Sequence, residues 1–237
     1  MTNPREEKMA KITVVVAHGA WADGSSWARV IAALKSDGVN VIAAPLPLTS
    51  LEDDAAAVDR SIDRVDGPIV LVGHAYAGAV IAEARSERVK ALIYVAALAP
   101  DEGEKVAEMF YRLPPHPKAP KLAPDANGLI WLPDEAFKSA FAQNASDEDL
   151  AVLAAVQRPI SPACITVPAG RPLWKHVPSW FLIAEDDRMI APETQRFMAE
   201  RMKATVRTHA VDHTPIVTSP RVVADIIVEA IKHVAKS

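Results

Sequence analysis

Three short segments, far apart in the chain, carry residues that could act together on a carbonyl group. One is Gly73-His74-Ala75-Tyr76-Ala77-Gly78, which directly follows a short apolar run. The second contains Asp187, after a later apolar run, and the third contains His213, after the last one. A carboxylate that accepts the Nδ1–H of an imidazole fixes the tautomer of the ring and leaves Nε2 free to take a proton. We therefore predict a general-base site that faces position 75.

Segment 73–78 has the spacing of a nucleophile elbow, G-x-S-x-G, but has alanine in place of the serine. Such a turn needs small flanking residues because its backbone is strained and packs closely against its neighbours. Here the frame falls on Gly73, Ala75 and Ala77, with Gly78 one place further on. Ala77 is a mild departure, whereas Ala75 is a severe one because a methyl group cannot attack a carbonyl. The spacing does not fit a dinucleotide-binding turn, because no G-x-G-x-x-G follows any apolar run.

The first apolar run ends in His18-Gly19-Ala20-Trp21, which predicts one half of an oxyanion hole. We expect the backbone N–H of Ala20 to be one donor, and that of Tyr76, which follows the nucleophile position, to be the other. We expect His18 and His74 to pack or form hydrogen bonds beneath the loops rather than to act as bases.

The acid and the base follow late strands. We prefer Asp187 to its neighbour Asp186, because D-x-x-I-x-P after a strand is the usual frame for this acid, and Asp101 is a weaker substitute. His213 lies in Asp212-His213-Thr214-Pro215, between the last apolar run and the last helical pattern. The order of nucleophile position, aspartate and histidine differs from the chymotrypsin and subtilisin orders.

The elements that must position these residues alternate between short apolar runs and segments of helical period. This pattern indicates an α/β fold, with a mostly parallel, doubly wound sheet and helices on both faces. We predict strands at residues 12–17, 39–44, 69–72, 91–96, 180–184 and 205–210. We predict helices at about 25–38, 50–65, 79–85, 192–202 and 220–234, with Ser25 as the cap of the first.

Residues from about 100 to 178 interrupt this alternation. They contain a proline-rich stretch, and then helical patches at about 134–143 and 147–156. About eighty residues is too long for an ordinary crossover between two strands. We therefore predict an inserted helical lid over one end of the sheet, and its aromatic and aliphatic content argues against disorder.

Composition limits the class of protein. With 237 residues, half of them apolar, the chain is expected to form a single domain over residues 1–237. A net charge of −4, without long runs of either sign, argues against a nucleic-acid or membrane partner. The start of the chain lacks the apolar core of a secretory signal, and Cys164 is the single cysteine. We expect a cytoplasmic protein with a small-molecule ligand, and its oligomeric state, a homodimer included, stays open.

The quoted segments give the chain a resemblance to small α/β hydrolases, the group of plant methyl-salicylate esterases, hydroxynitrile lyases and bacterial esterase-like proteins. The similar stretches are HGAWADGSSW, PLTSLEDD, VGHAYAGAVI, YVAALAPDEGE, PSWFLIAEDDRMI, TQRFMAERM and VDHTP. The resemblance implies the α/β-hydrolase fold over nearly the whole length. It also implies the Ala20 and Tyr76 amides as oxyanion hole, His213 as base and Asp187 as its orienting acid. It further implies a serine at position 75, which this chain lacks.

The pocket is expected between the carboxyl ends of the strands and the lid. Its aromatic residues favour a small apolar or aromatic molecule; the candidates are Trp21, Tyr76, Phe110, Tyr111, Trp131 and Trp174. We expect no cofactor and no metal, because the acids and histidines lack the spacing of a metal site. Cys164, Tyr76 and Thr214 are not expected to replace the missing serine.

Ala75 leaves two interpretations open. It either replaces a catalytic serine by design or is the native residue, and Tyr76 and Ala77 favour the second because both depart from the commoner G-H-S-x-G-G form. Loss of the serine costs about 10⁶ in kcat in subtilisin. Three hypotheses for function follow: an esterase-type protein acting on a small carbonyl or ester compound, a serine-independent His/Asp base enzyme (a lyase or a hydrolase that uses water directly), and a non-catalytic ligand-binding protein.

Overall fold

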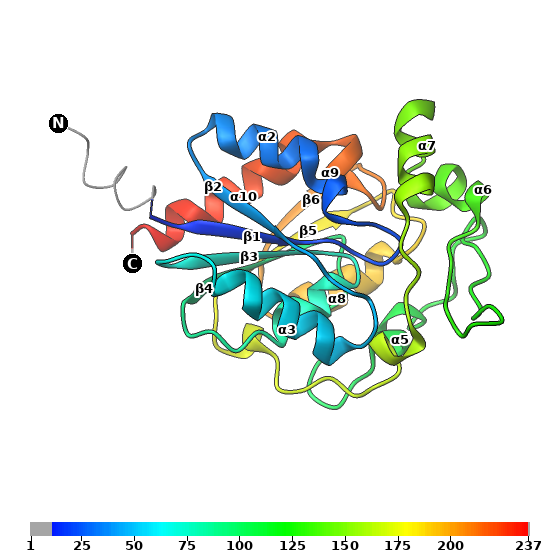
Figure 1. The fold of residues 1–237 in the computed structure, drawn as a ribbon, viewed down its shortest axis with the longest axis horizontal. Helices are drawn as coiled ribbons and strands as arrows, with labels where there is room; N and C mark the ends of the chain where they lie inside the picture. Colours follow the sequence, from blue (N-terminus) through cyan, green and yellow to red (C-terminus); the bar gives the residue numbers. More distant parts are fainter. Residues whose placement is uncertain (1–10, 237) are drawn as a thin grey trace.

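Six parallel strands form the centre of the structure, in the order β2-β1-β3-β4-β5-β6 (Figure 1). This computed structural model describes residues 11–236, so the segment 1–10, on which the expectation of no secretory signal depends, lies outside the described residues. Strands β1, β3 and β5 are buried along their whole length, which explains why they read as continuous apolar runs. The strands are β1 Thr13–Ala17, β2 Asn40–Ala44, β3 Ile69–His74, β4 Val89–Val95, β5 Ser179–Ala184 and β6 Thr205–His209.

Helices cover both faces of this sheet. On one face α2 packs against α10, and on the other α3 packs against α4, with α8 beside β5 (Figure 1). The predicted α/β class with a parallel, doubly wound sheet is therefore confirmed. These helices are α2 Ala28–Ser36, α3 Leu51–Ile62, α4 Ala77–Ala82, α8 Pro192–Arg201 and α10 Pro220–Val234, with a short α9, Pro215–Thr218, before the last one.

The caps of the first helices show how local sequence sets their ends. Ser50 caps α3 as its pattern suggests, because its Oγ accepts from the backbone N–H of Asp53 at 3.0 Å. The prediction that Ser25 caps the first helix is wrong. The chain enters this helix through the 3₁₀ turn η1, Gly24–Trp27, and the carboxylate of Asp23 accepts from the N–H of Ser25 at 2.8 Å.

The larger part of the segment between β4 and β5, residues 96–178, lies at the carboxyl end of the sheet, and its last part runs back to the start of β5 (Figure 1). The predicted helix 147–156 forms as α7, but the patch 134–143 forms a short α6 that runs into the π-helical turn η2. The elements of this segment are α5 Val106–Phe110, α6 Asp134–Ala136, η2 Phe137–Phe141, α7 Asp147–Val156, η3 Pro162–Cys164 and η4 Leu173–Lys175.

No helix among residues 11–236 is both long enough and apolar enough to cross a membrane.

Candidate active site

The site lies where the strand order reverses. The chain goes from β1 to β2 on one side and resumes at β3 on the other, so the loops after β1 and β3 diverge at the carboxyl edge of the sheet. A crevice forms at such a point in open α/β sheets. The loop after β1 carries Ala20 and Trp21, and the loop after β3 carries Ala75 and Tyr76, and all four residues line one cavity.

The turn at Ala75 has the backbone of a nucleophile elbow. Ala75 has φ of 51°, in the left-handed region that L-residues avoid. Its N–H donates to the carbonyl of Val95 at 3.2 Å, and its carbonyl accepts from the N–H of Leu98 at 3.0 Å. Two glycines let the backbone approach this closely. A Cβ on Gly73 would lie 2.6 Å from the carbonyl oxygen of Ala77, and one on Gly78 would lie 2.4 Å from that of Leu98.

His213 and Asp187 meet as the sequence predicts. The Nδ1 of His213 lies 2.9 Å from Oδ2 of Asp187, and both side chains are buried, at 2% and 0% exposure. The same carboxylate accepts from the backbone N–H groups of Met189 and Ile190, at 2.7 and 2.9 Å, and from the side-chain amide of Gln195 at 2.8 Å. Asp187 is thus held by four donors, and Nδ1 of His213 is the donor in their mutual bond.

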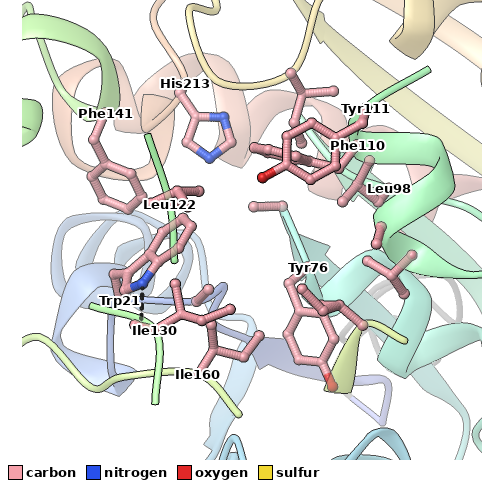
Figure 2. Close-up of a pocket in the computed structure, with 16 residues that line it drawn as sticks. Trp21, Tyr76, Leu98, Phe110, Tyr111, Leu122, Ile130, Phe141, Ile160 and His213 are labelled. Carbon is pink, nitrogen blue, oxygen red and sulfur yellow. Dashed lines mark hydrogen bonds between the residues drawn. The ribbon is translucent and has the colours of Figure 1, made fainter. Parts of the chain in front are cut away.

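The other ring nitrogen of His213 is directed into the cavity (Figure 2). Because Nδ1 carries the proton that it donates to Asp187, Nε2 is the nitrogen that can accept a proton from a ligand or a water molecule. The two weaker candidates for the acid that orients His213 have other surroundings. Asp186 is exposed, and Asp101 pairs with Nζ of Lys175 at 2.5 Å.

The backbone N–H groups of Ala20 and Tyr76 donate to no other residue within 11–236, and both residues line the cavity. The next amide, that of Trp21, donates instead to the carbonyl of Arg158 at 3.1 Å. Two free amides at the edge of a cavity are suited to receive a developing oxyanion.

His74 forms a hydrogen bond with the backbone of His213. Its Nε2 lies 2.7 Å from the backbone carbonyl of His213, so Nε2 carries a proton and donates it. The side chain is wholly buried, and burial together with the neighbouring imidazole of His213 lowers the pKa of His74 to about 3. His18 donates from Nδ1 to the carbonyl of Gly19 at 2.9 Å, and burial lowers its pKa as well. Both imidazoles pack beneath the loops, as expected from their positions.

The side chain of Tyr76 points away from the cavity centre (Figure 2) and into a buried polar cluster. Its hydroxyl donates to Oδ2 of Asp54 at 2.7 Å, and Oδ1 of the same carboxylate accepts from the N–H of Leu48 at 2.7 Å. Asp54 is fully buried, and desolvation raises its pKa. The thiol of Cys164 lies 3.6 Å from Asp54, and burial raises its pKa to about 12, so it is a poor nucleophile.

The cavity itself is almost entirely apolar. Its empty space, counted out to its mouth, is about 630 Å³. Apart from His213 and two tyrosines, its lining has no ionisable side chain, and the hydroxyl of Tyr111 is directed toward its centre (Figure 2). The lining residues are Ala20, Trp21, Ala75, Tyr76, Leu98, Val106, Ala107, Phe110, Tyr111, Leu122, Ile130, Phe141, Ile160, Ile165, Ile190 and His213.

Two of the predicted pocket residues do not line this cavity. Trp131 is 44% exposed, and its indole N–H donates to Asp125 at 3.2 Å, on the outside of the segment. Trp174 is buried elsewhere, with its N–H directed at the carbonyl of Pro100 and the guanidinium of Arg201 near its ring. Both indole N–H groups donate to partners that do not line the cavity, which the sequence pattern does not reveal.

Most of the apolar wall could not be assigned from the sequence, including Ile130, Ile160 and Phe141. Ile190 had a usable signal, because it is the isoleucine of the D-x-x-I-x-P frame that selected Asp187. Ile130 and Ile160 come from irregular backbone, and Phe141 ends the π-helical turn η2. There, periodicity does not show which side a residue faces.

The chain is similar to known proteins along nearly its whole length. A probable hydrolase, R7, from Phoma sp. is 24% identical over 256 residues, covering 93% of this chain and 98% of that protein. Methylesterase 8 from Arabidopsis thaliana is 22% identical over 249 residues, covering 93% and 90%. Among solved structures, polyneuridine aldehyde esterase superposes with a TM-score of 0.79 at 18% identity, covering 92% of this chain and 98% of that one.

A pyrethroid hydrolase from Sphingobium faniae superposes with a TM-score of 0.74 at 20% identity, covering 95% of this chain and all of that one. At these identities the solved structures establish the fold alone. The family model described as the alpha/beta hydrolase family matches residues 14–226, a span from β1 into α10. With this match added to the sheet order, the elbow and the late histidine, the chain belongs to the α/β-hydrolase family.

Proposed function

We propose that this chain is an esterase-type protein that binds a small, largely apolar ester or other carbonyl compound, and that His213 acts on this compound as a general base. One observation carries the proposal. A buried imidazole, oriented by Asp187 at 2.9 Å, presents its free nitrogen to an apolar cavity beside two unbonded amides. The names of the relatives, a methylesterase among them, support an ester as the substrate class.

In the direct route, the nucleophile is water. Nε2 of His213 takes a proton from the water as its oxygen bonds to the carbonyl carbon, and the carbonyl oxygen becomes an oxyanion. The amides of Ala20 and Tyr76 receive this negative charge. When the tetrahedral intermediate collapses, the imidazolium returns the proton to the departing alkoxide, and an acid and an alcohol leave.

The same base could instead remove a proton from a carbon next to the carbonyl, with the amides stabilising the enolate. In a β-hydroxy ketone the enolate then expels the β-hydroxyl group, which takes the proton from the imidazolium and leaves as water, and an α,β-unsaturated ketone remains. This is the lyase form of the proposal. In neither form does an acyl-enzyme arise, because Ala75 has no hydroxyl. We therefore expect turnover to be slow compared with that of a serine enzyme.

The test uses hydrolysis of p-nitrophenyl acetate and p-nitrophenyl butyrate by the unmodified chain and by His213→Ala. We expect linear release without a burst, falling to the buffer rate in His213→Ala. Exposed imidazoles also hydrolyse activated esters, so His176→Ala, at an exposed position, serves as the matched control. Equal rates for the unmodified chain and His213→Ala would contradict the hydrolytic form. A panel of β-hydroxy ketones, which lose water after proton abstraction from the carbon next to the carbonyl, tests the lyase form in the same pair.

A second candidate is a ligand-binding protein without turnover. It is favoured by the way Asp187 is held, because Met189, Ile190 and Gln195 would satisfy this carboxylate without any catalytic demand. The His213–Asp187 pair would then be a structural tie between two loops. This candidate predicts binding of a small aryl ketone, no product from any ester, and an effect of His213→Ala on affinity alone.

A further inference from the structure

A second cavity adjoins the first at its mouth. Phe110, Tyr111 and Leu122 line both, so these three side chains form the wall that the two cavities share. The outer cavity is completed by Met189, which directly precedes Ile190 of the inner one, and by the proline-rich stretch 115–121. The two cavities are therefore adjacent and meet at these three side chains.

The outer cavity has a cation on its wall. Lys121 lines it, and none of the residues that line it is acidic. No carboxylate lies between Glu108 and Asp125, whereas this stretch contains Arg112, Lys118 and Lys121. Within residues 11–236, Lys121 and Lys118 form no ion pair.

The arginine of this stretch already has a partner. The guanidinium of Arg112 stacks on the ring of Phe197, with 3.6 Å from its carbon to the ring centroid. Lys118 does not line the outer cavity, although it lies only three residues from Lys121. Lys121 is therefore the cationic residue on the wall of the outer cavity.

We propose that the outer cavity is a binding subsite for an anionic group, so that the ligand of this protein is a two-part molecule. Its apolar part, with the carbonyl, fills the inner cavity, and a carboxylate-type anion at its far end meets Lys121. This proposal rests on the proposed function, because it assumes that the inner cavity holds a carbonyl compound. The subsite extends the proposed function because it names the chemical class of the ligand, which is a carbonyl compound with a terminal negative charge.

The cost of removing water from an anion favours the outer cavity over the inner one as the place of the anionic group. An anion inside the inner cavity would lose its hydration against a wall of aliphatic and aromatic groups, which is costly. In the outer cavity it keeps water and gains an ammonium partner. A partly exposed pair of this kind strengthens binding about three- to fivefold, and added salt weakens it.

The experiment measures binding, so it does not depend on turnover. Isothermal titration calorimetry compares ω-oxo-ω-phenylalkanoates, which have three to five methylenes between the ketone and the carboxylate, with their neutral primary amides. Ketones cannot be hydrolysed, and each pair differs only at the terminal group. We expect at least one acid to bind about three- to fivefold more tightly than its amide, with this preference reduced in 0.5 M salt.

The matched variants are Lys121→Ala and Lys118→Ala. Lys121→Ala should abolish the preference for the acid and leave the affinity of the amide unchanged, whereas Lys118→Ala should preserve both. Equal binding of acid and amide at every chain length would overturn the subsite while leaving the proposed function standing. An equal loss of the preference for the acid in both variants would also overturn the subsite. It would indicate a general electrostatic attraction by the positive charges of this stretch and not binding at one site. If neither compound binds at any chain length, the subsite is overturned, whereas the proposed function stands or falls with the p-nitrophenyl ester hydrolysis of the unmodified chain and His213→Ala.

Discussion

At position 75 the backbone is that of a nucleophile elbow, while the side chain is a methyl group. The left-handed φ of 51° costs roughly 1–2 kcal/mol for a residue with a Cβ. The turn is held by main-chain hydrogen bonds to Val95 and Leu98 and by the close approach of Gly73 and Gly78, none of which involves the side chain at position 75. The elbow therefore does not depend on a serine for its shape.

It follows that Ala75→Ser should restore covalent catalysis without refolding the turn. We expect a burst of p-nitrophenol with p-nitrophenyl butyrate and a steady rate at least about 10²-fold above that of the unmodified chain. Mass spectrometry of the quenched protein should show a butyryl adduct on the peptide containing residue 75. The double variant Ala75→Ser with His213→Ala is the control. A folded Ala75→Ser protein without burst or adduct would argue against an esterase ancestry of this site.

At the same scale, residues differ in how well the sequence predicts them. Asp187 and His213 could be assigned because each lies at a fixed place after a strand, and the structure brings them to 2.9 Å. The pocket aromatics could not be assigned in this way. Trp21, Phe110 and Tyr111 line the cavity, but Trp131 and Trp174 do not, because the direction of a side chain in irregular backbone depends on tertiary contacts.

At the scale of elements, a buried polar cluster ties α3 to the elbow. Tyr76, at the start of α4, donates to Asp54 within α3, and the Asp54 carboxylate also receives the N–H of Leu48, which has φ of 60°. The Cys164 thiol comes from η3, in the long segment between β4 and β5. One carboxylate thus joins three parts of the chain below the turn that carries Ala75.

We expect Tyr76→Phe to destabilise the fold by about 1–3 kcal/mol, because the buried Asp54 carboxylate loses its hydroxyl donor at 2.7 Å. Tyr94→Phe is the matched control. Tyr94 is fully buried, but its hydroxyl has no hydrogen-bond partner within residues 11–236, so its removal should be neutral or slightly stabilising. Urea unfolding monitored by circular dichroism measures both. Equal losses in the two variants would mean that the packing of the hydroxyl group, and not the bond to Asp54, accounts for the loss.

The elements themselves were largely predictable, with instructive exceptions. Helices at 147–156 and 220–234 form with the expected bounds, because an N-cap serine and a strong apolar period, respectively, mark them. Helix α4 starts two residues earlier than expected, since the elbow leads directly into it. The π-helical turn η2 could not be anticipated. It is closed by the bond from the N–H of Ala142 to the carbonyl of Phe137, at 2.8 Å, and has no periodicity of its own.

For the whole molecule, buried neutral histidines make stability depend on pH. The pKa of His74 falls from 6.5 to about 3 on folding, and that of His18 is also lowered. Below pH 6.5 these two histidines therefore bind protons in the unfolded chain but remain neutral in the folded one. Stability from these groups is complete above the unfolded pKa and is lost as the pH falls toward the folded one.

His74→Gln tests this dependence, since its amide can still donate to the carbonyl of His213. Between pH 6.5 and 4 the unmodified chain should lose up to about 1.4 kcal/mol per pH unit through His74 alone. The variant should lose less over the same range. Urea midpoints at pH 7.5, 6, 5 and 4 give the two slopes, and other titrating groups cancel in the comparison. Parallel slopes would show that His74 becomes protonated in the folded protein without penalty.

The strained turn at Ala75 also has a genetic consequence. Every alanine codon becomes a serine codon by one change of its first base. Because the backbone already holds that position as a nucleophile requires, a single point mutation separates this gene from one that encodes a complete serine, histidine and aspartate set. Laboratory selection for growth on an ester should therefore reach that codon in one step, before any other part of the protein has to change.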